Sequence, residues 1–480
     1  MQRRIFQSLI KQNLFIKNKS VQGIYRSKFY NLQAQSFSTS QKEDIDLNQL
    51  TSEIEQLKKK VGTNTQPKSS MQDEQLSELS QFEAFQSASR YASLEKFELA
   101  EQKFQEALNI LNEQQPDRID LQIILMKRLA LMYKLQDKNY LLTPLLEDIY
   151  FKHLAFYSYK NVDYIKILKN LLTHYCIYDL ERGSIFLEMI LEQLQHEEIP
   201  KVIVRDIYLY AGIIHALKGD DFNQSERFLQ ESIQAGLQPI QKGIAYNNLA
   251  CVTYWNCLKL LLELSQTTKE EEKKQKQLQE EIQERIQLVA PLIKRAFNAF
   301  EFEEKNRQKD QINEQQFTIL KKLFDEEQKV FDLTGLKPED VLLKNPMSSV
   351  CAMNMGEFLF YSGDFNASQF WLQVSQYSST KLESLHRVLR TIVISALAAK
   401  KQNKIEFAEN LLIDCLEYSE NYTTFNKVFA LESYSQILKQ QGRNYEANSY
   451  QQQSDNLRNV LSFWDERKEN ILIPDYDFKF

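Results

Sequence analysis

The sequence predicts an all-α protein built from repeated helix pairs, for three reasons. The first is composition: the chain has 11 glycines and 9 prolines in 480 residues, whereas an average protein has roughly 7% glycine and about 5% proline. Sheets and phosphate-binding loops need glycine in their tight turns, so this composition favours long helices. The second reason is that one stretch of sequence occurs twice. The third is that a fixed spacing of small and large residues recurs along most of the chain.

The duplicated stretch is a turn followed by a helix. Its first copy reads LKGDDFNQSERFLQESIQAG from Leu217, and its second reads YSGDFNASQFWLQVSQYS from Tyr361. Each copy follows an apolar segment that carries another glycine, Gly212 or Gly356, seven residues before the turn glycine. A glycine inside a helix costs roughly 1 kcal/mol relative to alanine. We therefore expect it where a neighbouring helix comes too close for a β-carbon.

The helix after each turn supplies a matching surface. Its small, large and small residues are spaced by four and three positions, which places them on one helical face. These residues are Ser225, Leu229 and Ser232 in the first copy and Ser368, Leu372 and Ser375 in the second. The pattern predicts two antiparallel helices in tight contact.

The same pattern recurs in ELAEQKFQEALNIL from Glu98, AYNNLACVTYW from Ala245, IEFAENLLIDCL from Ile405 and ALESYSQILKQQGRNYEANSY from Ala430. It resembles the tetratricopeptide repeat (TPR), a helix–turn–helix unit of about 34 residues. The family's tryptophan is mostly Tyr or Ala here, and its closing proline is often missing. The resemblance implies a TPR-like helical-repeat superhelix, an α-solenoid with about eight degenerate repeats over residues 81–460, which presents a concave groove.

Three segments fall outside the repeats. Residues 265–287 have no aliphatic residue between Leu264 and Leu278 and are rich in charge, which predicts a solvated helical insertion. Residues 43–80 combine a short helix with a linker, because LNQLTSEIEQLKKKV spaces its apolar residues by three and four. That helix either packs on the repeats or contacts a partner, as in a coiled coil. Residues 461–480 form a C-terminal tail.

The N-terminal sequence has the features of a targeting signal. Residues 1–42 hold eight Lys or Arg and no acid, and this basic amphipathic pattern is typical of a mitochondrial transit peptide. A disordered basic tail is the alternative. Without this segment the net charge changes from −6 to −6 − 8 = −14, which argues against nucleic-acid binding. The longest later apolar run, Thr391–Ala399, is far shorter than the ~20 residues of a membrane span. We expect a mitochondrial protein, in the matrix or associated with the inner membrane through partners.

No motif for chemistry is present. The sequence lacks the glycine-rich phosphate loops and the nucleophile elbow, and HEEIP from His196 lacks the second histidine of a zinc protease. The five cysteines are scattered without a C-x-x-C pair. We therefore expect no catalytic residue, no metal and no cofactor, and the chain is predicted not to be an enzyme.

The resemblance implies a protein-binding groove lined by the first helix of each repeat. At the corresponding positions this sequence has Leu209, Ile213, Leu217, Asn247, Asn248, Tyr254, Trp255, Met353, Asn354, Phe360 and Tyr361. This surface is apolar and aromatic with a few amides, so we expect it to be covered. A partner helix, the insertion or the chain's own tail ILIPDYDFKF could cover it. Alternatively, these side chains form ordinary core between repeats.

The functional expectation is a protein-interaction scaffold. The layout of presequence, helical lead and degenerate array is similar to that of mitochondrial TPR proteins that support respiratory complex III, so we expect an assembly or maintenance factor for a respiratory-chain or other mitochondrial complex. A stable accessory subunit of a respiratory complex or mitoribosome is the alternative. A receptor for chaperone tails is a third reading: Asn248 suits its carboxylate clamp, but Leu209 and Ile213 stand where Lys and Asn are required.

Overall fold

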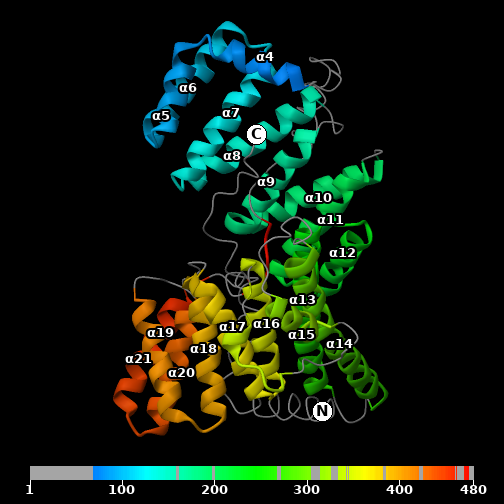
Figure 1. Ribbon diagram of the computed structural model, residues 1–480, viewed down its shortest axis with the longest axis vertical. Helices are drawn as coiled ribbons and strands as arrows, with labels where there is room; N and C mark the ends of the chain where they lie inside the picture. The colour runs from blue at the N-terminus through cyan, green and yellow to red at the C-terminus, as the bar shows by residue number, and fades with distance from the viewer. Residues whose placement is uncertain are drawn as a thin grey trace. The chain divides into compact units, whose positions relative to one another are not determined.

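The structure is a computed structural model (Figure 1). It describes residues 69–480 except 158–161, 197–199, 268–271, 304–313, 326–332, 342, 344, 382–384, 421–424, 460, 462–466, 468–469 and 475–480. The described residues form helices and turns and contain no strand, so the all-α prediction is confirmed. The predicted transit peptide and residues 43–68 of the helical lead lie outside the described residues.

The chain divides into two compact units. Among the described residues, the N-terminal unit holds 69–210 and 474, and the C-terminal unit holds 211–473. The helices of the N-terminal unit are α4 (Ser69–Leu79), α5 (Glu83–Ser93), α6 (Phe97–Gln114), α7 (Ile119–Leu135), α8 (Asn139–Tyr157), α9 (Val162–Tyr178) and α10 (Leu180–His196). The division falls inside α11 (Lys201–Lys218).

The C-terminal unit contains the longest helices. They are α12 (Phe222–Gln234), α13 (Pro239–Gln266), α14 (Glu272–Asn298), a π-helical turn η2 (Ala299–Glu303), α15 (Glu314–Leu323), a 3-10 turn η4 (Pro338–Asp340), α16 (Pro346–Tyr361), α17 (Phe365–Lys381), α18 (Leu385–Lys401), α19 (Ile405–Tyr418), α20 (Phe425–Gln440) and α21 (Asn444–Arg458). None of the described helices is long and apolar enough to cross a membrane.

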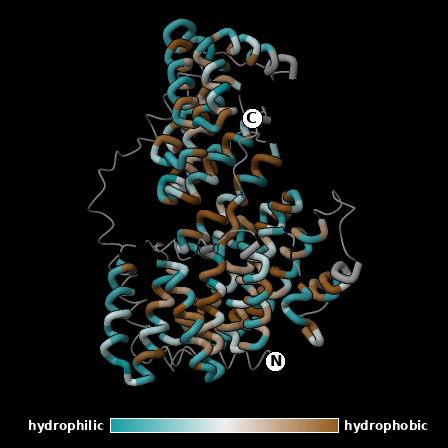
Figure 2. The backbone as a smooth tube through the Cα atoms, turned by 60° about the vertical axis from the view of Figure 1, so that its left-hand side comes forward, coloured by the Kyte–Doolittle hydropathy of each residue, from teal (hydrophilic) through white to brown (hydrophobic). Residues whose placement is uncertain are grey.

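The helices pack as consecutive hairpins. From α5 to α10, from α12 to α14 and from α16 to α21, each helix contacts the next one along the chain. In addition, α18 contacts both α16 and α20. That arrangement is the helical-repeat solenoid that the sequence predicts. Hydrophobic and hydrophilic residues alternate along the helices (Figure 2), as helices with a buried side and a solvated side require. In the last two hairpins the buried side gathers Leu389, Val393, Leu412, Tyr434 and Ile437 into one core.

The two copies of the duplicated stretch make the same contacts. A β-carbon built on Gly212 would lie 2.5 Å from Leu229 Cγ, and one on Gly356 would lie 2.6 Å from Leu372 Cγ. Ser225 Oγ donates a hydrogen bond of 2.7 Å to the Gly212 carbonyl oxygen. In the second copy, Ser368 Oγ donates to the Gly356 carbonyl at the same distance of 2.7 Å. The glycine therefore admits the leucine, while the serine ties the two helices together.

Five of the turns between helices share one backbone geometry. In five hairpins the third residue after the last helical residue donates its N–H to a carbonyl five residues earlier, at 2.9 or 3.0 Å, as in the Schellman motif. A left-handed residue precedes each donor, with φ between 53° and 83°. It is glycine at two of these turns and Glu95, Asp137 or Asn403 at the other three. The donors are Lys96, Lys138, Asp364, Lys404 and Arg443.

The charged segment at 265–287 is helical where the structure describes it, since residues 272–287 form the first half of α14. This half packs against the end of α13, where Leu261 and Ile282 are both buried. Arg285 Nη1 donates to both carboxylate oxygens of Glu226 on α12, at 2.7 and 2.6 Å. The segment therefore belongs to the C-terminal unit through apolar and ionic contacts.

Candidate protein-binding groove

The structure places nine of the eleven predicted groove residues in the interior. Leu209 belongs to the N-terminal unit, and the other ten belong to the C-terminal unit, on α11, α13 and α16. Trp255 and Tyr361 are half-buried, and the other nine are at most 7% exposed. A segment of this same chain covers the three asparagines among them.

The covering segment is Asn470–Leu472 near the C-terminus (red in Figure 1). Asn470 is 6% exposed, Ile471 3% and Leu472 2%. Their partners are Asn247 and Asn248 on α13 and Asn354 on α16. The structure therefore brings the three predicted groove asparagines together around Asn470–Leu472, which we call the tail segment. It begins in a turn, since the N–H groups of Asn470 and Ile471 both donate to the Arg467 carbonyl oxygen at 3.1 Å.

Asn248 holds both main-chain groups of one residue. Its Nδ2 donates to the Leu472 carbonyl oxygen at 2.7 Å, and its Oδ1 accepts from the Leu472 N–H at 2.8 Å. An amide side chain has one donor and one acceptor side by side, which matches the donor and acceptor of an extended residue. Both hydrogen bonds go to main-chain atoms, so they do not depend on the identity of the side chain at position 472.

The carbonyl oxygen of Asn470 is held by two more amides. Asn247 Nδ2 donates to it at 3.1 Å and Asn354 Nδ2 at 2.9 Å. The Cys251 thiol lies 3.7 Å from the same oxygen. Burial raises the pKa of Cys251 well above its usual range, and the nearby Glu357 carboxylate adds to the effect. The thiol is therefore protonated and serves as a weak donor here rather than as a nucleophile.

The side chain of Asn470 is recognised as a donor. Its Nδ2 donates to Asn354 Oδ1 at 2.7 Å and to Glu357 Oε2 at 3.0 Å. Glu357 is 8% exposed and is neutralised by Arg390 on α18, whose Nη2 lies 2.5 Å from Oε1. An ionised carboxylate only accepts hydrogen bonds. It therefore fixes the orientation of the Asn470 amide and, through it, of Asn354 and Asn247.

A second anchor lies three residues before Asn470. Arg467 Nη1 donates to the carbonyl oxygens of Leu217 at 3.0 Å and Lys218 at 3.2 Å, at the end of α11. A cation is favoured at this position because the last carbonyls of a helix lack partners within it. The guanidinium carbon also lies 5.7 Å from the Phe222 ring centre and 5.8 Å from that of Trp255.

Several apolar groove residues contact neighbouring helices. Phe360 belongs to a core with Leu372 and Ile394. Tyr254 packs edge-on against Phe358 with ring centres 5.5 Å apart. These contacts correspond to the alternative of core between repeats, whereas the asparagines and Trp255 contact the tail segment and Arg467.

Sequence reasoning missed Glu357, Arg390, Arg467 and Asn470. One signal was present: Glu357 is the only charged residue of α16, whose sequence is PMSSVCAMNMGEFLFY. A lone acid in an apolar helix indicates a buried partner. Arg390 supplies that partner, but it is 33 residues away in sequence, so pattern alone could not identify it.

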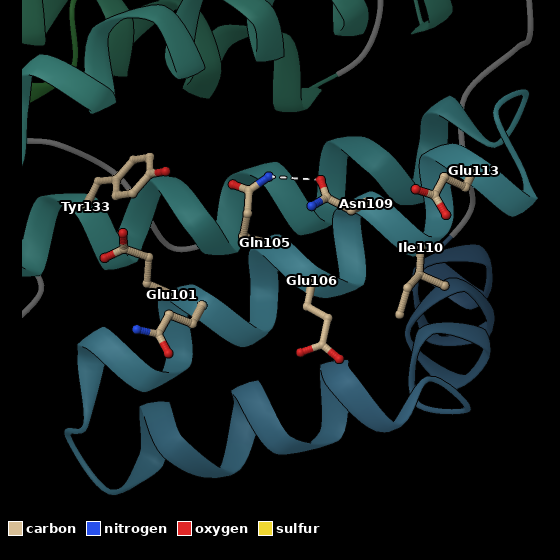
Figure 3. A pocket seen from close by; sticks show the side chains of 8 residues that line it. Glu101, Gln105, Glu106, Asn109, Ile110, Glu113 and Tyr133 are labelled. Carbon is tan, nitrogen blue, oxygen red and sulfur yellow. Dashed lines mark hydrogen bonds between the residues drawn. The ribbon is translucent and has the colours of Figure 1, made fainter.

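A separate hollow lies on the N-terminal unit (Figure 3). It has a volume of about 440 Å³ and is lined by Glu101, Glu106, Glu113 and neighbouring residues of α6 with Tyr133 of α7. Glu101 already pairs with Lys138 at 2.6 Å. Within the described residues no group of three or more His, Cys, Asp or Glu is arranged to hold a metal ion.

A scan against models of known protein families finds no match to this chain. A search of curated proteins finds none either.

Proposed function

We propose that this chain is a TPR-like scaffold that binds short segments of other proteins in its groove. The observation that supports this proposal is the pair of hydrogen bonds, 2.7 and 2.8 Å, between Asn248 and the main chain of Leu472. A side chain that bonds both the N–H and the C=O of one residue can bind a peptide through its main chain, whatever side chain that residue carries. Three buried asparagines without a peptide would leave amides unsatisfied, at a cost of about 1–3 kcal/mol each.

The test is quantitative co-purification of the full chain with a tag at an internal loop, followed by separation of native complexes by size. The test variant is Asn248→Ala with Asn354→Ala, which removes two side-chain amides that donate to main-chain carbonyl oxygens. The matched control is Tyr445→Ala on α21, where the tyrosine side chain is 89% exposed. We expect a defined partner set with the wild type and Tyr445→Ala and its loss in the double variant. A wild-type chain that migrates alone and carries no partner would overturn the proposal.

We further propose that the protein acts in mitochondria as an assembly or maintenance factor, for example for a respiratory complex. This rests on the acid-free basic sequence of residues 1–42. A fluorescent reporter fused to those residues is expected to enter mitochondria, and a chain lacking them is expected to stay in the cytosol. Mass spectrometry that finds residues 1–42 intact on the mitochondrial protein would contradict the transit-peptide assignment.

The alternative function is a permanent accessory subunit. Size separation distinguishes the two, because a subunit migrates wholly with one large complex and an assembly factor migrates mostly in small or transient species. The chaperone-tail receptor gains no support from the groove. Asn248 bonds an internal main-chain unit rather than a terminal carboxylate, and the sequence has Leu209 and Ile213 where the clamp requires Lys and Asn.

A further inference from the structure

We propose that the groove is a binding site selective for a peptide with a primary-amide side chain followed by two aliphatic residues, and that the tail segment is its built-in competitor. The ligand is a short segment of another protein that displaces Asn470–Leu472. The inference rests on the proposed function and specifies its ligand.

Selectivity for an amide comes from two acceptors that face one donor group. Asn354 Oδ1 and Glu357 Oε2 lie 2.7 and 3.0 Å from Asn470 Nδ2. An NH₂ group has two hydrogens and satisfies both. An aspartate in the same place has the same size but no donor, and its charge would oppose that of Glu357. The site therefore distinguishes Asn from Asp by chemistry rather than by shape.

Selectivity for aliphatic residues comes from burial. Ile471 and Leu472 are 3% and 2% exposed, and a polar side chain at either place would lose its hydration. The main-chain bonds to Asn247, Asn248 and Asn354 add affinity without adding further side-chain requirements. The recognised pattern is therefore Asn–aliphatic–aliphatic that leaves a turn, since the N–H groups of Asn470 and Ile471 both donate to the Arg467 carbonyl oxygen.

Competition follows because one chain carries both the site and a ligand for it. Asn248 and Leu472 are 224 residues apart, so the tail segment acts as a tethered peptide at high effective concentration. A partner segment must then bind more tightly or arrive at a higher local concentration. Arg467 sets the tether, since its guanidinium bonds to the end of α11 at 3.0 and 3.2 Å.

The test uses the full chain and a dye-labelled peptide with the sequence of residues 467–480. In the Asn470→Asp chain the tail segment carries the wrong group, so the groove is expected to be vacated. We expect this variant to bind the wild-type peptide about tenfold or more tightly than the wild-type chain does. The same peptide with its asparagine replaced by aspartate is expected to bind the variant about tenfold or more weakly.

Two controls locate the binding. Adding Asn248→Ala to the Asn470→Asp chain is expected to abolish peptide binding while circular dichroism stays unchanged. Hydrogen exchange at Leu472, measured in the Asn470→Asp chain, reports whether the tail segment has left. If Asn470→Asp fails to fold or to release the tail, a chain that ends at Asn459, just after α21, replaces it in every measurement.

Three results would overturn the inference. One is a released or truncated chain that does not bind the peptide. The second is equal binding of the asparagine and aspartate peptides, and the third is binding that persists with Asn248→Ala. The proposed function has a separate readout, because partners of the wild-type chain can be lost or retained in co-purification independently of this peptide.

Discussion

At the scale of single residues, one glycine and one serine determine how closely the two helices of a repeat approach each other. Gly356 leaves room for Leu372, since a β-carbon would lie 2.6 Å from its Cγ. Ser368 adds a bond of 2.7 Å to the same glycine's carbonyl. The sequence predicted this contact correctly, because a glycine inside an apolar helix destabilises that helix unless a neighbour needs the space. The contact between Asn470 and Asn354 could not be predicted in this way, since the two residues are 116 positions apart and no repeating sequence pattern relates them.

The first prediction concerns Gly356→Leu. Four extra carbons at this contact are expected to force α16 and α17 apart and to lower the free energy of unfolding by about 1–3 kcal/mol or more. Because repeats depend on their neighbours, thermal melting followed by circular dichroism is expected to broaden. The control is Gly356→Ala combined with Leu372→Ala, which restores space and is expected to couple favourably. An unchanged, sharp transition in Gly356→Leu would show that the helices tolerate separation.

The second prediction concerns two buried histidines of the N-terminal unit. Burial, with a smaller contribution from the neighbouring Lys127 and Lys134, lowers the pKa of His153 to about 3 and that of His174 to about 4. In the unfolded chain the pKa of each is about 6.5, so only the unfolded chain takes up these protons as the pH falls below that value. Their contribution to stability is therefore complete above pH ~6.5 and is lost progressively toward pH ~4, with a slope of up to about 1.4 kcal/mol per pH unit for each.

The variant His153→Leu tests this. Hydrogen exchange of α8 and α9 at pH 6 and pH 4.5 is expected to show a smaller loss of protection in the variant than in the wild type. Both chains share the same carboxylates, so the difference reports His153 alone. An identical loss in the two chains would mean that His153 takes up its proton in the folded state.

At the scale of the elements, five pairs of helices are joined by one kind of turn, and the sequence marks only some of these turns with a glycine. Gly363 and Gly442 mark two turns with φ of 83° and 79°, and glycine adopts that conformation without strain. Glu95 and Asp137 stand at the same place in two other turns, with φ of 56° and 53°. Their side chains favour other conformations, so sequence alone does not reveal that these turns are equivalent.

The third prediction follows from that equivalence. Glu95→Gly is expected to raise the free energy of unfolding by up to about 1 kcal/mol, because the left-handed conformation costs an ordinary residue about 1–2 kcal/mol and glycine's extra chain entropy offsets part of the gain. Gln102→Gly, at an exposed position inside α6, is expected to lower it by about 1 kcal/mol. Chemical denaturation measures both. A destabilised Glu95→Gly chain would mean that the glutamate side chain stabilises the turn.

The fourth prediction concerns the attachment of α14. Arg285 and Glu226 have side chains 21% and 12% exposed and approach to 2.6 Å. Arg285→Met leaves the carboxylate without its main partner and is expected to cost about 1–3 kcal/mol. Lys276→Met lies on the same helix, where Lys276 is 78% exposed and 4.0 Å from Glu280, and is expected to change stability by less than about 0.5 kcal/mol. Equal effects of the two substitutions would mean that the buried pair adds nothing.

At the scale of the whole molecule, the sequence predicted the class of fold well and the groove in part. Low glycine content and a duplicated helix pair were sufficient for the all-helical repeat architecture. The positions of Asn247, Asn248 and Asn354 followed from the repeat pattern. The sequence offered the chain's own tail as one of three possible covers but could not choose among them, since tail segment and groove are joined only by long-range contacts, such as the bond between Asn354 and Asn470 across 116 residues.

The long separation in sequence between the groove and the tail segment has a consequence for synthesis. Asn247 leaves the ribosome 223 residues before Asn470, which corresponds to roughly 10–45 s at ~5–20 residues per second. During that interval the groove amides have no tail segment to bond. The groove is filled only after Asn470 has left the ribosome, so a chain cut short before Asn470 keeps exposed amides and apolar surface. Such a surface distinguishes unfinished copies from finished ones and gives chaperones and proteases a feature to recognise.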